Sequence, residues 1–272
     1  MLVLNSPVEA ELLSQGVNTK TDLEIINILE PDTLKAIYDK YVAAGAHCMV
    51  ANTKGCLKAK LAMQNLDDRL DDIAEASLKV VNSVKPQHVI VEFGSCGLPL
   101  DIESKNSLIE IKDQYVYSAR IFEKNKNKFD AYLLSGMHRT EEMKCALMGL
   151  RQVSDKPIFI TAKFDDDGML NEHENIYDYA NVVSEYGATI VGLETSHNMH
   201  KLTKRLRASV ELPILLDIDI TEEPPDDMLD VSMQANKDGA QFLRATGNCR
   251  VAHTAVLSAS TSKLEVAWKS SF

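Results

Sequence analysis

A chain of 272 residues that is 45% hydrophobic can bury a sizeable core, and its length suits a single barrel domain. The formal net charge of -11 argues against nucleic acid and anionic membranes as partners. No apolar run approaches the roughly 20 residues that a membrane span requires. Residues 1–11 lack the basic start and cleavage site of a signal peptide, so we expect a cytoplasmic protein.

Eight short apolar runs alternate with eight longer amphipathic stretches. The predicted strands and the helices after them are 1–4 and 31–45, 47–51 and 70–84, 88–94 and 107–125, 131–136 and 140–153, 157–164 and 175–187, 189–195 and 198–210, 213–219 and 225–239, and 241–247 and 250–260. The runs are apolar throughout, which is typical of parallel strands covered on both faces. Pro31 and Pro225 suit a first helical turn. Gly45, Gly187 and Gly239 suit helix ends.

Eight strand–helix units in a chain of this length predict an α/β fold, a single (β/α)8 TIM barrel over residues 1–272. No glycine-rich phosphate-binding motif follows a strand, which disfavours an open nucleotide-binding sheet. Active sites of such barrels collect at the C-terminal ends of the strands. The candidates there are Asn5, Glu9, Asn52, Thr53, Glu92, Ser95, Ser135, His138, Lys163, Asp165, Glu194, Thr195, Asp217, Asp219, Arg244 and Thr246.

The five cysteines are scattered and odd in number. Without an export signal we expect reduced thiols, and none forms a C-x-x-C pair that would indicate a thiolate-rich metal site. Each is expected to be a small buried hydrophobic residue. They are Cys48, Cys56, Cys96, Cys145 and Cys249.

The stretch YVAAGAHCMVANTKGCLKAKL, residues 41–61, resembles the Y-x-x-A-G-A-D-x-x-x-T-N-T-F-G-A region of homocysteine S-methyltransferases, a family that includes the homocysteine domain of cobalamin-dependent methionine synthase. Further parallels follow in the family's order along nearly the whole chain. They are LNSPVEAELLSQGVN, VEFGSCGLPL, ATIVGLETS and DGAQFLRATGNCRVAH. The resemblance implies a TIM barrel.

The resemblance also implies a zinc ion held by three cysteine thiolates, one at the end of strand 6 and two at the end of strand 8. Such a zinc ion keeps an open position that binds homocysteine sulfur as a thiolate. This chain has Thr195, Thr246 and Gly247 at those positions, while His253 falls on the family's terminal histidine. Cys249 lies two residues beyond the pair, so zinc is not expected at the family site.

Other family motifs are altered as well. The opening D-G-x-M-G-T reads Asn5, Ser6, Val8, Glu9 and Ala10. Ser135 and Gly136 replace the Glu-Thr after strand 4, and residues 218–221 replace P-N-A-G after strand 7. The retained parts are Asn52 with Thr53 and the small-residue turn 94–97.

We therefore predict a methyltransferase-like protein that acts in corrinoid- or folate-linked methyl transfer without the three-cysteine zinc, on a small-molecule substrate and with a corrinoid-binding protein as its possible partner. The alternative is a non-catalytic barrel that binds a small ligand or a partner protein. The predicted catalytic residues are Glu92, Lys163, Glu194, Asp217, Asp219 and Arg244. The predicted substrate-binding residues are Asn5, Asn52, Thr53, Ser95, Ser135, His138, Thr195 and Thr246.

Several of these residues have more than one interpretation. Glu92, Glu194, Asp217, Asp219 and His197 could hold a harder cation, or the carboxylates could be rim residues paired with lysine and arginine. Lys163 could form a Schiff base if a nearby cation lowered its pKa, or it could pair with a carboxylate. His197 and His200 are spaced to share one helix face, but exposure is favoured. His138 is either a general base or an exposed loop residue.

Overall fold

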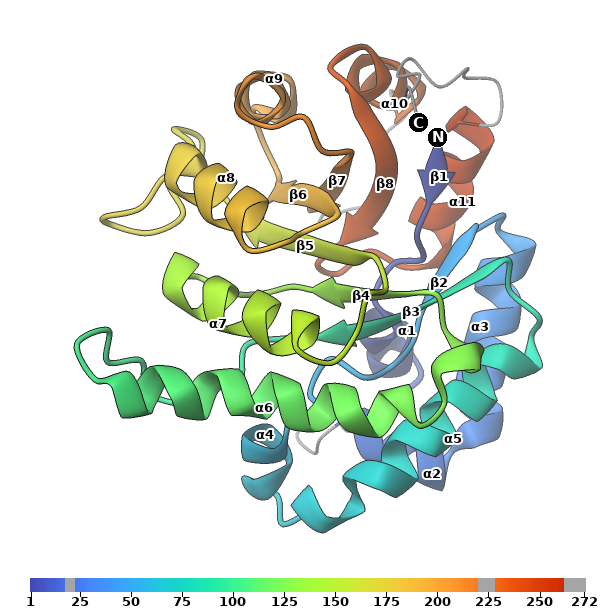
Figure 1. Ribbon diagram of the computed structural model, residues 1–272. Helices are drawn as coiled ribbons and strands as arrows, with labels where there is room; N and C mark the ends of the chain where they lie inside the picture. Colours follow the sequence, from blue (N-terminus) through green and yellow to red (C-terminus); the bar gives the residue numbers. More distant parts are fainter. Residues whose placement is uncertain (18–22, 220–227, 262–272) are drawn as a thin grey trace.

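The computed structural model describes residues 1–17, 23–219 and 228–261, and there the predicted barrel is confirmed (Figure 1). Its sheet has the order β1-β8-β7-β6-β5-β4-β3-β2, and all paired neighbours are parallel. The eight strands of this sheet match the eight apolar runs. They are β1 Leu2–Val3, β2 Cys48–Val50, β3 His88–Phe93, β4 Ala131–Leu134, β5 Ile158–Lys163, β6 Ile190–Thr195, β7 Ile214–Asp219 and β8 Ala240–Thr246.

The short first strand closes the barrel. β1 pairs with β8 through Leu2 and Phe242, and Leu4 just after it bridges to Cys48 at the start of β2. The backbone N–H of Asn5 donates to the carbonyl of Cys48 at 3.2 Å. The segment after β1 therefore joins the last strand to the second, and Asn5 lies at the mouth of the barrel.

The eight predicted helices surround the strands (Figure 1). Pro31 is the first residue of its helix, and Gly45, Gly187 and Gly239 adopt positive φ after theirs, as predicted. Pro225 and residues 220–221 lie outside the described residues. The helices are α3 Pro31–Ala43, α5 Leu70–Ser83, α6 Lys105–Glu123, α7 Thr140–Arg151, α8 Ile176–Glu185, α9 Met199–Ser209, α10 Met228–Lys237 and α11 Val251–Thr261.

Short helices that the sequence did not reveal occupy the connections after the first two strands. α1 spans Val8–Ser14 and α4 spans Lys58–Ala62, while α2 spans Ile26–Leu29. Single turns of 3-10 helix, η1 Leu23–Ile25 and η2 Asp67–Arg69, lie beside them, and η3 is Lys126–Lys128 after α6. These pieces are too short to show helical periodicity. The connections after β1 and β2 leave the C-terminal ends of those strands. Their short helices therefore build part of the barrel mouth.

Two apolar layers hold the barrel together. The larger lies between strands and helices, and the smaller fills the barrel interior with residues such as Ile90, Leu215 and Phe242. Successive inward positions of a strand are two residues apart. The next inward residues on the same strands are Glu92, Asp217 and Arg244. An apolar floor thus lies directly beneath a charged layer at the mouth.

None of the helices in the described part of the chain is long and apolar enough to cross a membrane.

Candidate active site at the barrel mouth

A row of charged residues crosses four neighbouring strands. Sheet register pairs Lys163 with Glu194, Glu194 with Asp217, and Asp217 with Arg244. Neighbouring strands lie about 4.8 Å apart, so adjacent members of this row feel one another's charge strongly. The apolar side chains below them exclude water. The interactions between these charges therefore dominate the chemistry of the mouth.

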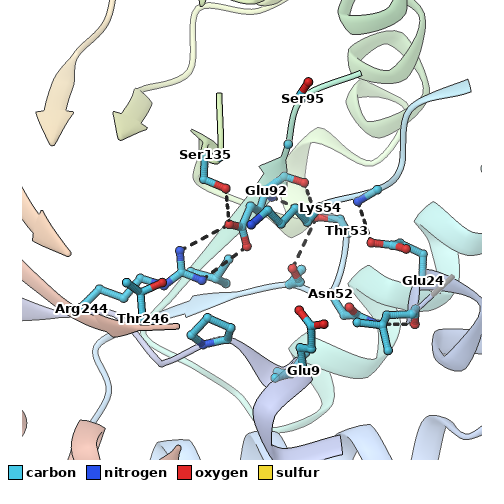
Figure 2. Close-up of a pocket in the computed structure, with 18 of the residues that line it drawn as sticks. Glu9, Glu24, Asn52, Thr53, Lys54, Glu92, Ser95, Ser135, Arg244 and Thr246 are labelled. Carbon is cyan, nitrogen blue, oxygen red and sulfur yellow. Dashed lines mark hydrogen bonds and ion pairs between the residues drawn. The ribbon is translucent and has the colours of Figure 1, made fainter. Parts of the chain in front are cut away.

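Arg244 and Glu92 form a buried ion pair across the barrel (Figure 2). The two guanidinium Nη atoms each lie 3.4 Å from a different Glu92 oxygen, and the Ser135 hydroxyl donates to Oε1 at 2.6 Å. Arg244 Nε also donates to the Asn5 carbonyl at 3.2 Å. Burial opposes ionisation of Glu92, but Arg244 and then Lys54 hold the pKa of this carboxyl below its ordinary value. Glu92 is therefore a carboxylate at neutral pH.

Asp217 lies in the same layer, but its pKa is shifted in the opposite direction, upward. Its side chain is 1% exposed, and Oδ1 has no hydrogen-bond partner among the described residues. Burial raises the pKa of Asp217 to about 7, with Arg244 opposing the rise and Glu194 and Glu92 adding to it. A carboxyl with this pKa can both accept and release a proton near neutral pH.

Lys163 forms ion pairs rather than standing alone. Its Nζ lies 2.5 Å from Asp219 Oδ2 and 3.5 Å from Glu194 Oε1, and half of its side chain is exposed. The hydrogen bond that Lys163 donates to Asp219 raises the pKa of Lys163 despite some burial. A Schiff-base lysine needs a lowered pKa. The ion-pair interpretation of Lys163 therefore fits the structure, and the Schiff-base interpretation does not.

A cavity of about 620 Å³ opens at the mouth, and most of the predicted residues line it. Of the predicted set, Lys163, Asp219 and Thr195 are not among its lining residues; the Thr195 hydroxyl instead donates to the His197 carbonyl at 2.6 Å. The predicted residues that do line the cavity are Asn5, Asn52, Thr53, Glu92, Ser95, Ser135, His138, Glu194, Asp217, Arg244 and Thr246.

Several predicted substrate-binding residues also brace the walls. Asn5 Oδ1 accepts from the Val50 N–H at 2.6 Å, and Asn52 Nδ2 donates to the Leu23 carbonyl at 2.8 Å. The Thr53 hydroxyl bonds both backbone groups of Glu92 at 2.9 Å. Ser95 donates to Glu142 at 2.8 Å. These bonds fix where the strand ends and loops sit around the cavity.

Lining residues that sequence reasoning missed come from the connections after the first two strands. They are Glu24, Lys54, Lys60 and Gln64. Lys54 extends over Glu92 in Figure 2, and its side chain lies against Gly94 and Gly136; an added Cβ would crowd it at Gly94. The small residues after strands 3 and 4 were a usable signal, because they leave room for a long neighbour.

Comparison with known proteins identifies the family of this barrel. The family model for homocysteine S-methyltransferase matches residues 2–254. The chain belongs to the homocysteine S-methyltransferase family. It is 24% identical over 208 residues to methionine synthase of Mycobacterium leprae and 23% identical over 197 residues to that of Mycobacterium tuberculosis. These matches cover 70% and 68% of this chain but only 17% and 16% of the relatives, so the chain spans about a sixth of their length.

Solved structures of the homocysteine methyltransferase MmuM from Escherichia coli share the fold. Its oxidized and metallated forms each match with a TM-score of 0.81 at 14% identity, over 95% of this chain and 95% and 96% of theirs. The carboxyl transferase domain of Rhizobium etli pyruvate carboxylase matches more loosely, with a TM-score of 0.54 at 13% identity over 90% of this chain and 40% of that one. These likenesses establish the TIM barrel.

The positions predicted from the resemblance to correspond to the family's zinc cysteines lie close to the ion pairs of the mouth. Thr195 ends β6 and Thr246 ends β8, with Gly247 directly after it at φ +67°. A Cβ at position 247 would collide with Asp219 Oδ1. Cys249 is fully buried. The residues present at the three positions supply no thiolate, so they do not fit a three-thiolate zinc site.

The alternative metal ligands are not gathered into one cluster. Within residues 1–17, 23–219 and 228–261, no group of three or more histidine, cysteine, aspartate or glutamate side chains could hold a metal ion. The prediction that His197 and His200 share a helix face is wrong, because α9 begins at Met199 after the left-handed Asn198. His197 contacts Ser196, and His200 pairs with Asp238 at 2.6 Å.

Proposed function

We propose that this family member is a methyltransferase that binds a small polar acceptor in the mouth cavity and takes up the acceptor's proton on Asp217. The observation that carries this proposal is a cavity-lining carboxyl, buried above an apolar floor, whose pKa lies near 7. Such a group is matched to general-base work at neutral pH. Family membership supports methyl transfer as the reaction.

The proposed step is a displacement. The acceptor's proton moves to an oxygen of Asp217, and the freed electron pair of the acceptor attacks the donor's methyl carbon. The bond between methyl and donor breaks and its electron pair stays with the donor: a corrinoid cobalt keeps the pair, while a folate nitrogen takes up a proton from water with it. Asp217 later releases its own proton to water. Arg244, held by Glu92, favours the ionised form of Asp217 through its positive charge.

We further propose that this activation replaces the three-thiolate zinc. Zinc would lower the pKa of a thiol by direct coordination, whereas Thr195, Thr246 and Gly247 offer no such ligands. The methyl donor is proposed to be a corrinoid or folate presented by another protein or module, because the chain spans only about a sixth of the methionine synthases that it matches.

A methyl-transfer assay tests the proposal. Purified protein would be incubated with methylcobalamin or methyltetrahydrofolate and a panel of small thiols and amines, and methylated products would be measured by mass spectrometry. We expect turnover that Asp217→Asn lowers by about 10²–10⁴-fold, while Asp72→Asn, an exposed change on α5, has no effect.

The competing non-catalytic interpretation makes a different forecast. It predicts ligand binding with no product from any donor, and equal background rates for the unmodified protein and Asp217→Asn. That result would overturn the methyltransferase proposal and favour a binding function for the barrel.

A further inference from the structure

The charges around the cavity are unevenly distributed. Two cationic side chains, Lys54 and Lys60, come from the connection after β2 and lie against the glycines after strands 3 and 4. The opposite side, formed by β6 and β7, presents Glu194 and Asp217 side by side. We call these two carboxylates the acidic end of the cavity.

The nearest cations do not neutralise the acidic end fully. Arg244 makes its two carboxylate contacts, each at 3.4 Å, with Glu92 rather than with Asp217, and Lys163 binds Asp219 more closely than Glu194. Asp217 Oδ1 is left without a hydrogen-bond partner among the described residues. An unpaired buried carboxylate oxygen is costly, so a bound group that donates hydrogen bonds and carries positive charge would stabilise this site.

The residue types that line the cavity limit the chemical class of the ligand. The described lining residues include no phenylalanine, tyrosine or tryptophan, so the cavity has no cage of such ring faces for a quaternary ammonium. An anion beside Asp217 and Glu194 would be repelled. A primary or secondary ammonium carries both the charge and the N–H donors that the unpaired oxygen lacks.

We infer that the acidic end, Glu194 and Asp217, binds the protonated amino group of a small primary or secondary amine. Its role as methyl acceptor rests on the proposed function, but its binding does not. Asp217 Oδ1 accepts an N–H bond from the amine, and Glu194 adds a second negative charge at the cavity wall.

Calorimetric titration without any methyl donor tests this inference. The probes would be butylamine, 1-butanol, butyrate and tetramethylammonium at pH 8 and constant ionic strength. We expect butylamine to bind at least about 10-fold more tightly than the other three, since hydrogen bonds in which one partner is charged are stronger than neutral ones. Equal affinity for butylamine and 1-butanol would overturn the inference.

Variants locate the effect. Asp217→Asn should remove the preference for butylamine, and Glu194→Gln, at a partly exposed side chain, should weaken it while leaving the fold intact. Glu75→Gln, on the exposed side of α5, is the matched control and should bind butylamine as before. A preference that survives in both Asp217→Asn and Glu194→Gln would place the amine elsewhere and refute the assignment.

Binding and turnover separate this inference from the proposed function. Selective butylamine binding without methyl transfer would support the amine site and refute the methyltransferase. Methyl transfer to neutral or thiol acceptors only, with no amine preference in the titration, would do the reverse.

Discussion

At the scale of single residues, the mouth contains two buried carboxyls with opposite pKa shifts. Glu92 receives both guanidinium Nη atoms of Arg244 and stays ionised, whereas Asp217 lies beside the same arginine without a direct bond and has a pKa near 7. Carboxyls whose environments push their pKa values apart can take different roles in one site. In the proposed function, Glu92 fixes Arg244 and Asp217 exchanges protons.

Asp217 should make the stability of the fold depend on pH. The folded state binds the Asp217 proton more tightly than the unfolded chain does, so its contribution is full at low pH and is lost as pH rises from the ordinary pKa of 3.8 towards about 7. Asp217→Asn has no such titration. At pH 8 the variant should therefore exceed the unmodified protein by as much as about 4 kcal/mol of unfolding free energy.

Urea unfolding at intervals between pH 5 and pH 8 measures that difference. The gap between Asp217→Asn and the unmodified protein should widen as pH increases to about 7 and level off above it, because Asp217 is then ionised in both the folded and the unfolded state. A constant gap, or one that shrinks with pH, would mean that the Asp217 pKa is not raised in the folded state. Asp72→Asn serves as the control for a general loss of one acidic charge.

Breaking the Glu92–Arg244 pair should lower the free energy of unfolding. Glu92→Gln leaves the Arg244 guanidinium, only 2% exposed, without its carboxylate partner. We expect a loss of about 3 kcal/mol in unfolding free energy, because a buried charge without its partner keeps its desolvation cost. The double change Glu92→Leu with Arg244→Met should recover most of that loss. If the double variant were as unstable as Glu92→Gln, lost packing rather than the unpaired charge would be the cause.

At the scale of elements, the sequence predicts what local patterns encode. Continuous apolar runs predicted the eight strands, and the alternation of inward positions explains why Glu92, Asp217 and Arg244 share one layer. Short helices such as α4 were missed because one turn has no periodicity. Lys54 was missed for a related reason: its approach to Glu92 depends on how a loop folds across two other strands.

The ends of β7 and β8 are packed closely at Gly247. Gly247→Ala adds the cost of a non-glycine residue at positive φ to a collision with Asp219, the ion-pair partner of Lys163. We expect a loss of about 2–3 kcal/mol in unfolding free energy. Gly16→Ala is a matched control, because Gly16 also has positive φ but no atom of the described residues within 4 Å of an added Cβ.

Comparing these two glycines separates the cost of the contact between the added Cβ and Asp219 from the cost of positive φ. Gly16→Ala should cost only about 1 kcal/mol, and Asp219→Ala should reduce the cost of Gly247→Ala to a similar value. Equal costs at both glycines in the unmodified background would show that Asp219 does not occupy the space beside position 247.

At the scale of the whole molecule, the barrel combines a family fold with a mouth built from ion pairs. All five cysteines and all seven histidines of the chain lie in its described parts, where no cluster suited to a metal is found. Because structural zinc sites are built from such thiolates and imidazoles, we expect the stability of the fold not to depend on zinc.

We accordingly expect purified protein to contain far less than one zinc ion per chain by mass spectrometry, and its Tm to be unchanged by a chelator. A ligand that binds only the folded state raises stability with its concentration, so added zinc should also leave Tm unchanged. Cys249→Ala is the decisive variant, because Cys249 is the cysteine next to the positions of the family's zinc ligands. Stoichiometric zinc that disappears in Cys249→Ala would mean that the correspondence at the end of β8 is wrong and that a thiolate activates the acceptor after all.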